Sequence, residues 1–273
     1  MTRMPEGVRP AAGRGDVAQP SVEPHRFRCQ LRWADVDSLG HVNNVAYADY
    51  LQEAHRSMLT NDPYAWAVAD RGGVRRQELT YLAPMVPSAE SEVVIESRLT
   101  GCGDELAIDS EVIGVTGGDR TVTARSKALL GRPAEPARGQ AVRPDHAHQY
   151  AAAVRFSDLD VNGIVGDTSY FVYLQEARIA LMADLGLDPT STVVAQKNVD
   201  FLRHDLDQPT TFEVWTWVSR VGNRSVTFES SVSHGDVAFA HGSSTLVFFD
   251  LEAQRSTMPP ASVTAALRSL TIS

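Results

Sequence analysis

Apolar and polar side chains alternate along residues 27–33, an arrangement that puts Trp33 on the apolar face. A period of two residues is typical of a strand with one buried face. After Gly40 the period changes to that of one helical face, and Asn43 or Asn44 suits the N-cap of this helix. The apolar positions of the predicted helix are Tyr47, Tyr50, Leu51, Ala54 and Met58.

The same order of patterns occurs a second time along the chain. A second helix is predicted from Asp167 to Gly186, where a glycine suits the C-cap. Each helix is followed by four runs that have the composition of strands and are separated by turn residues. The runs are 74–82, 92–100, 105–115 and 120–130, then 193–202, 212–219, 225–233 and 237–249. One strand, one long helix and four strands form an α+β unit, in which the sheet must cover the helix.

Residues 32–54 and 155–177 carry one signature in two copies, with a constant offset of 123 positions. Eleven of the 23 paired residues are identical, which indicates two copies of one structural unit. The expected organisation is a disordered leader at 1–24, a first repeat at 25–132, a linker at 133–147, a second repeat at 148–250 and a tail at 251–273 in which Pro259 and Pro260 favour the start of a short helix.

Composition narrows the class of protein. The formal net charge of −9 excludes the basic footprint of a nucleic-acid-binding protein. The two cysteines, Cys29 and Cys102, match no metal or redox spacing, which favours a reducing, cytoplasmic compartment. No segment approaches the roughly 18 apolar residues of a membrane span. We therefore expect a cytoplasmic protein without a membrane span, a nucleic-acid partner or a bound metal.

Each copy of the signature places an aspartate in a loop that ends at a helix N-terminus. The aspartates are Asp37 and Asp160, and the helix starts are Asn44 and Asp167. Unpaired backbone N–H groups at a helix start can hold an oxyanion, while a nearby carboxylate can act as a general base or nucleophile. The alternative interpretation is that the aspartates only close Asx-turns or cap the helix.

The signature resembles a known family. Its first copy reads Trp33-Ala-Asp35-Val-Asp37-Ser-Leu-Gly40-His41-Val-Asn43-Asn44-Val-Ala-Tyr47. This segment resembles the hot-dog-fold acyl thioesterases of the 4-hydroxybenzoyl-CoA thioesterase type, and its His-Val-Asn-Asn stretch is similar to long-chain acyl-CoA and plant acyl-ACP thioesterases. The resemblance implies a tandem double hot dog, in which each unit is a long helix wrapped by an antiparallel sheet of about five strands. It also implies that the two units pair within one chain and that no cofactor is needed, and it allows further homo-oligomerisation.

The resemblance assigns roles to residues of both copies. The catalytic carboxylate corresponds to Asp37 and Asp160, and the backbone N–H that binds the thioester oxygen corresponds to Asn44 and Asp167. Acyl-ACP members also use an asparagine two residues after the aspartate and a histidine four residues after it. The first copy has His41 but lacks the asparagine. The second copy has Asn162 but lacks the histidine, so the simpler arrangement of an aspartate and a helix start remains.

The expected function is hydrolysis of an acyl-CoA to the free acid and CoA. Alternatives are a non-catalytic acyl-CoA binding module, an acyl-ACP thioesterase and a hot-dog hydratase or dehydratase. The last class carries an Asp-x-Asn-Pro-x-His motif, whereas Asp160-Val-Asn162-Gly-Ile164 lacks the proline and the histidine. Because His41 and Asn43 are replaced by Ile164 and Gly166, we expect Asp160 to be harder to ionise and the first site to carry most of the catalysis.

Overall fold

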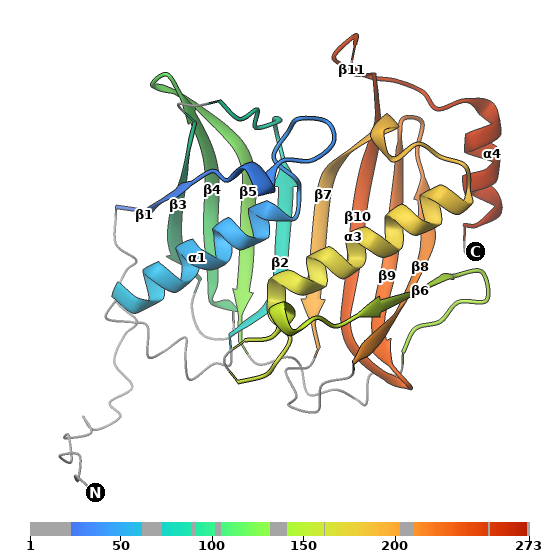
Figure 1. The fold of residues 1–273 in the computed structure, drawn as a ribbon, viewed down its shortest axis with the longest axis horizontal. Coiled ribbons are helices and arrows are strands. Elements are labelled where there is room, and N and C mark those ends of the chain that lie inside the picture. Colours follow the sequence, from blue (N-terminus) through green and yellow to red (C-terminus); the bar gives the residue numbers. More distant parts are fainter. Residues whose placement is uncertain are drawn as a thin grey trace, which may run out of the picture.

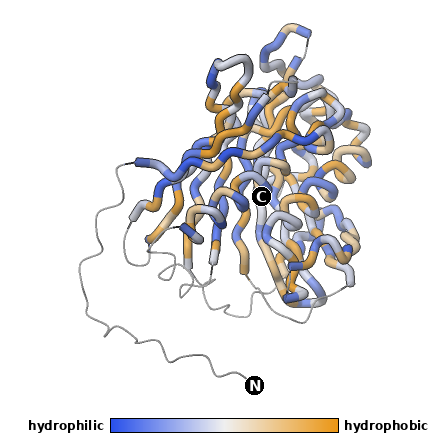
Figure 2. The backbone as a smooth tube through the Cα atoms, turned by 60° about the vertical axis from the view of Figure 1, so that its left-hand side comes forward, coloured by the Kyte–Doolittle hydropathy of each residue, from blue (hydrophilic) through white to orange (hydrophobic). Residues whose placement is uncertain are grey.

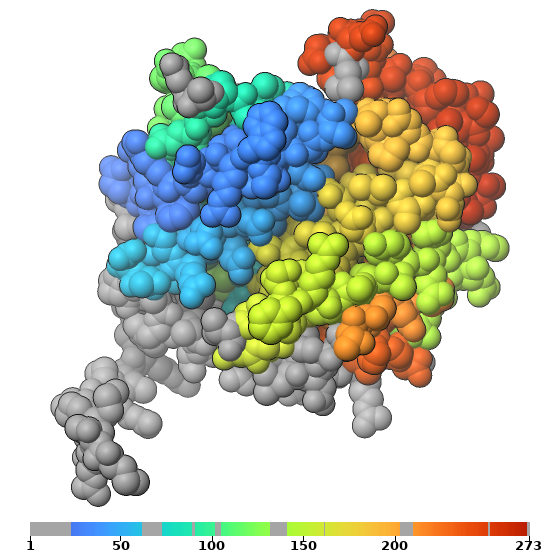
Figure 3. All heavy atoms as spheres, in the orientation of Figure 1, coloured from blue at the N-terminus to red at the C-terminus, as the bar shows by residue number. Residues whose placement is uncertain are grey.

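Two long helices, α1 (Ala46–Asn61) and α3 (Asp167–Asp184), lie across one face of a single antiparallel sheet in the computed structural model of the protein (Figure 1). Figure 3 shows the side chains of the two helices meeting along the middle of this face. The structure describes residues 23–61, 73–88, 91–101, 105–131, 141–160, 162–202, 210–250 and 252–271.

The sheet repeats one arrangement of strands in mirror order. From edge to edge the order is β1-β3-β4-β5-β2-β7-β10-β9-β8-β6, and β11 pairs with β10 as the eleventh strand. Each half therefore has its first strand at the outer edge and its second strand at the centre. The strands are β1 (His25–Gln30), β2 (Val74–Tyr81), β3 (Glu92–Thr100), β4 (Ala107–Thr116), β5 (Asp119–Leu130), β6 (His148–Ala153), β7 (Thr192–Phe201), β8 (Thr211–Val221), β9 (Ser225–His234), β10 (Val237–Asp250) and β11 (Arg255–Ser256), with 3₁₀ turns at η1 (Trp33–Asp35), η3 (Phe156–Asp158) and η4 (Pro189–Ser191).

The two halves of the sheet meet where β2 and β7 pair, from Arg76 opposite Asp200 to Thr80 opposite Gln196. Nη1 of Arg76 lies 2.7 Å from Oδ2 of Asp200, and Nε of Arg76 lies 2.7 Å from Oε1 of Glu78. Each central strand thus covers the exposed edge of the other. The antiparallel sheets predicted for the two repeats are confirmed, and they form one continuous layer.

One hydrophobic core lies between the helices and the sheet and includes residues of both halves. Leu51 and Ala54 of α1 and Leu174 and Ala177 of α3 belong to it, at the positions that helical periodicity predicts. Figure 2 shows hydrophobic and hydrophilic residues alternating along the strands. Gly242 in β10 allows Leu174 to approach the sheet, because a Cβ at Gly242 would lie 2.5 Å from Cδ1 of Leu174. The core therefore joins the two halves into one folded body.

The predicted tail contains a further helix, α4 (Ala261–Ser269). Leu267 of α4 is fully buried and packs in a second hydrophobic cluster with Leu181 of α3 and Val218 of β8. The tail thereby covers the outer end of α3. Residues 1–22 of the predicted leader and 133–140 of the predicted linker lie outside the described residues.

The strand predicted at 27–33 is wrong in its last part. β1 ends three residues before Trp33, which lies in η1 and is 88% exposed. The carboxylate of Asp35 accepts a backbone N–H at 2.8 Å and the Tyr50 hydroxyl at 2.6 Å, and these bonds hold the chain in a turn. Phe156 is the counterpart of Trp33 in the second copy and is 94% exposed. Alternation alone could not reveal this turn, since the aromatic residue continues the apolar pattern.

Candidate active site

Asp37 lies in the tight loop between η1 and α1. Its Oδ1 accepts the backbone N–H groups of Leu39 at 2.9 Å and His41 at 3.3 Å. Gly40 permits the turn because its φ of 73° lies in the left-handed region. Within the described residues, Oδ2 of Asp37 accepts no hydrogen bond. One carboxylate oxygen therefore closes an Asx-turn, as the alternative interpretation holds, while the other is available to a substrate.

Asp160 has the same loop but a different environment. Its Oδ1 accepts the N–H groups of Asn162 at 2.8 Å and Ile164 at 2.9 Å, and its Oδ2 accepts Nδ2 of Asn162 at 3.2 Å. Asp160 is exposed, and the backbone hydrogen bond from Ile164, aided by those from Asn162, lowers the pKa of its carboxyl group. The expectation that Asp160 is harder to ionise is wrong, because two backbone N–H groups and the side chain of Asn162 donate hydrogen bonds to its carboxylate.

The start of α1 is fixed by contacts from both halves. Oδ1 of Asn43 accepts the N–H of Val45 at 3.1 Å, and the helix begins one residue later. Nδ2 of Asn44 donates to Oε1 of Gln175 on α3 at 2.7 Å, while the Tyr81 hydroxyl donates to the Asn44 carbonyl at 2.8 Å. The backbone N–H of Asn44 has no acceptor among the described residues. A rigidly held amide donor therefore remains for a ligand at this helix start.

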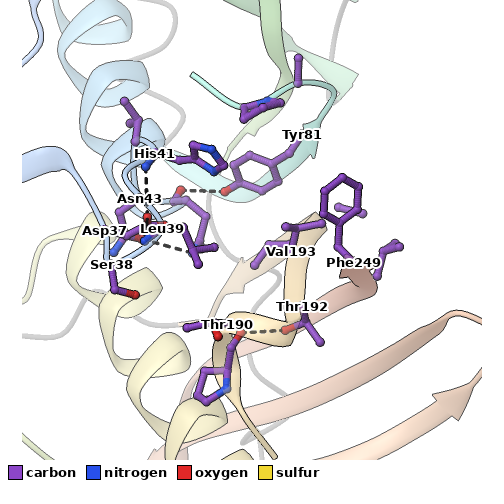
Figure 4. A pocket seen from close by; sticks show the side chains of 18 of the residues that line it. Asp37, Ser38, Leu39, His41, Asn43, Tyr81, Thr190, Thr192, Val193 and Phe249 are labelled. Carbon is purple, nitrogen blue, oxygen red and sulfur yellow. Dashed lines mark hydrogen bonds between the residues drawn. The ribbon is translucent and has the colours of Figure 1, made fainter. Parts of the chain in front are cut away.

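A cavity of about 720 Å³ opens beside this loop, at the junction of the two halves. Its near wall includes Asp37, His41 and Asn43 of the first copy, and Val193 and Phe249 of the second copy line it as well (Figure 4). Apolar atoms make up the larger part of the exposed lining, and polar side chains from both halves stand among them. Such a cavity suits an apolar ligand whose polar part is oriented by specific groups.

The second copy has a smaller cavity of about 470 Å³. Asp167 at the start of α3 lines it together with Gln52 and His55 of α1, which correspond by the offset of 123 to two α3 residues of the larger cavity. Asp160 and Asn162 do not line this smaller cavity. The second copy thus has its helix start at a cavity, whereas its carboxylate lies outside.

Two residues that the sequence reasoning did not select, Gln175 and Arg178, line the larger cavity. Burial leaves Arg178 only 6% exposed and lowers the pKa of its guanidinium to about 10. A signal was present in the sequence, because Arg178 follows Leu174 by four residues and falls on the apolar face of α3. Glu53 and Glu176 on the helices are exposed, and neither lines this cavity.

Two further properties concern the described part of the chain. It contains no group of His, Cys, Asp and Glu side chains that could hold a metal ion. None of its helices combines the length and hydrophobicity that crossing a membrane requires. The polar lining of the larger cavity includes Asp37, the start of α1, Gln175 and Arg178 of α3, and on the second half also Thr190, Thr192 and Arg255.

Residues 31–130 and 154–267 match the family model of the thioesterase-like superfamily. These two segments cover most of the chain, so the protein belongs to this superfamily. Each matched segment contains one copy of the signature. No curated protein matches the sequence significantly.

Solved structures of thioesterases share the fold across most of this chain. The 12:0-ACP thioesterase from Umbellularia californica is 15% identical, with a TM-score of 0.59, and the match covers 81% of this chain and 92% of that one. A protein provisionally assigned as an oleoyl thioesterase from Lactobacillus plantarum is 13% identical, with a TM-score of 0.63 and coverages of 83% and 96%. An acyl-ACP thioesterase from Bacteroides thetaiotaomicron is 10% identical, with a TM-score of 0.52 and coverages of 81% and 96%. At these identities the likeness concerns the fold alone, which is the hot-dog thioesterase fold. The family match, together with this fold, makes the protein a thioester hydrolase.

Proposed function

We propose that the protein is a tandem double hot dog, with units at 25–132 and 148–250, that hydrolyses acyl-CoA thioesters to a free acid and CoA. The observation that carries the proposal is the geometry of the larger cavity. There, within the part of the chain that the structure describes, Asp37 has one carboxylate oxygen without a hydrogen bond and Asn44 has a backbone N–H without an acceptor. An acyl chain would occupy the apolar part of the cavity.

The proposed chemistry uses these two groups on one thioester. The carbonyl oxygen accepts the N–H of Asn44, which stabilises the negative charge that develops on that oxygen as the carbonyl carbon is attacked. Asp37 either removes a proton from the attacking water or attacks the carbonyl carbon itself to form an anhydride that water then cleaves. On both routes the C–S bond breaks, the sulfur leaves as the thiol, and the acyl group leaves as a carboxylic acid.

His41 and Gln175 are proposed to position these groups rather than to react. The backbone N–H of His41 holds the bound oxygen of Asp37, and Gln175 holds the side chain of Asn44 from the other half of the chain. The contact of Gln175 with Asn44 makes the first site dependent on the second repeat.

CoA is the proposed carrier because neither loop has both polar residues of the acyl-ACP motif. Leu39 stands at the asparagine position of the first loop, and Ile164 stands at the histidine position of the second. Acyl-ACP is the competing carrier, since two of the structural relatives are named as ACP thioesterases. Thiol release from CoA and ACP thioesters of the same acyl group separates the two carriers.

The experiment that tests the proposed site compares Asp37→Asn with the matched variant Asp160→Asn. We expect Asp37→Asn to lower turnover of a good acyl-CoA by at least ~100-fold, the scale of losing an acid–base group. Asp160→Asn should retain most of the activity, because Asp160 lies outside both cavities. If Asp160→Asn abolishes turnover while Asp37→Asn keeps it, the active site lies in the second copy and the assignment is reversed.

A further inference from the structure

Arg178 is a buried cation with almost no partner among the described residues. It lines the larger cavity and is 6% exposed. Its guanidinium makes one hydrogen bond within the described residues, from Nη1 to Sδ of Met182 at 3.9 Å, and no ion pair within 4.0 Å. A guanidinium has five N–H donors. Most donors of Arg178, a side chain that lines the cavity, therefore have no partner among the described residues.

The surroundings of Arg178 contain a second basic group, and among the described residues no carboxylate forms an ion pair with it, since the exposed Glu176 acts on Arg178 only from beyond ion-pair distance. Lys197 is 1% exposed, and its Nζ donates to the carbonyl of Phe171 at 2.7 Å. Burial, together with the charge of Arg178, lowers the pKa of the Lys197 amine well below its usual range. Asp37 is the one acidic side chain among the described residues that line the larger cavity, and it is not paired with Arg178. A buried charge without a counter-ion is strongly unfavourable, so an anion in this cavity would be held tightly.

The corresponding position of the first copy shows that the fold does not require a charge here. His55 lies 123 positions before Arg178 and is 5% exposed. Its Nε2 lies 3.1 Å from Oγ of Ser110, and burial lowers its pKa to about 4, so His55 is neutral near pH 7. A positive charge at this helix position is therefore a property of the larger cavity alone.

The place of Arg178 along α3 indicates which part of a substrate would meet it. Gln175 holds Asn44, whose N–H is the proposed donor to the thioester oxygen. Arg178 follows Gln175 by three residues, about 4.5 Å along the helix axis. A group bound by Arg178 would therefore lie a few bonds from the thioester carbonyl, and the burial of Arg178 suits a group on the acyl part of the substrate.

We propose that the acyl group carries a carboxylate, so that the substrate is the monothioester of a short dicarboxylic acid. This inference rests on the proposed thioesterase function and names its substrate class. A carboxylate would form two parallel hydrogen bonds with the guanidinium of Arg178. A hydrocarbon chain of equal length would leave the guanidinium unpaired, and sites built for a polar group discriminate strongly against analogues that lack it.

The test measures kcat/KM for succinyl-, glutaryl- and adipyl-CoA against butyryl-, pentanoyl- and hexanoyl-CoA. For the best length, wild type should prefer the carboxylated substrate at least ~10-fold, and Arg178→Met should lower this preference at least ~30-fold. Arg178→Lys keeps the charge without the forked donors and should give an intermediate preference. Arg125→Met removes an exposed arginine of β5 outside the cavity and should leave the preference unchanged.

A binding measurement separates this inference from the proposed function. Free adipate, but not hexanoate, should raise the melting temperature of wild type, and Arg178→Met should abolish this shift, whereas any shift with CoA alone should be the same in both proteins. If no thioester is cleaved while adipate still binds through Arg178, the proposed hydrolase function is contradicted, whereas the carboxylate-binding site at Arg178 is supported. If wild type prefers the plain acyl-CoAs, or if Arg178→Met lowers both substrate series equally, the carboxylate inference is overturned. A shift with CoA alone that depends on Arg178 overturns it as well, since the anion would then be a phosphate.

Discussion

His55 and Arg178 occupy the same position in the two copies of the helix, yet they have different protonation behaviour. His55 is bonded to Ser110, lines the smaller cavity and is neutral, whereas Arg178 keeps its charge and lines the larger cavity. Both stand on an apolar helix face in the sequence. The surroundings of each side chain, and not its residue type alone, decide whether it supports the core or a ligand.

The buried state of His55 predicts a loss of stability in mild acid. Its pKa is about 4 in the folded protein and about 6.5 when unfolded, so the unfolded chain binds the extra proton between these values. The contribution of the neutral imidazole to the free energy of unfolding is complete above about pH 6.5 and is lost as the pH falls toward 4. Between pH 7.5 and 5, wild type should lose about 2 kcal/mol more free energy of unfolding than His55→Gln.

Urea unfolding at both pH values measures this difference. His25→Gln, which changes a partly exposed histidine bonded to Ser57, is the control and should respond to pH as wild type does. An equal loss in wild type and His55→Gln would show that protonation of His55 does not limit acid stability.

At the scale of elements, the periodic patterns predicted the strands well. None of the eight strands downstream of the helices differs by more than two residues at either end from its predicted range. The failure at Trp33 has a local cause, because side-chain hydrogen bonds to Asp35 form a turn that hydrophobic alternation does not encode. Hydrophobic periodicity reports which face is buried, and it fails where polar contacts set the backbone.

The approach of α3 to the sheet depends on Gly242. A methyl group there would meet Cδ1 and Cδ2 of Leu174, so Gly242→Ala should lower the free energy of unfolding by about 1–3 kcal/mol. Leu174→Ala alone should cost about 2–5 kcal/mol through the cavity that it leaves. The double variant should cost less than the sum of the two, because the smaller side chain makes room for the methyl group. If the losses of the two single variants simply add in the double variant, as measured by urea unfolding, the contact between Gly242 and Leu174 is not the cause of the loss in Gly242→Ala.

The whole molecule is organised around the pairing of β2 with β7. This pairing places the start of α1 beside α3, and the side chains of Asn44 and Gln175 meet although they are 131 positions apart. The larger cavity is lined from both halves, so neither half contains the complete candidate site.

Each half should therefore depend on the other. Expressed alone, residues 1–138 would expose the edge of β2 and the apolar face of α1. We expect this fragment to be insoluble or to form a homodimer in sedimentation experiments. A monomeric fragment with full thiol-release activity would contradict both the shared core and the shared site.

The sequence by itself determined the repeat, the order of helices and strands, and the positions of Asp37 and Asn44 at a loop and a helix start. These features depend on residues that are close along the chain, and a pattern of period two or 3.6 records them directly. Only the tertiary structure decided that Asp37 lines the large cavity while Asp160 is exposed, and that Gln175 and Arg178 complete the lining. These contacts join segments more than 100 residues apart, and they exist because β2 and β7 pair and bring the two helices together.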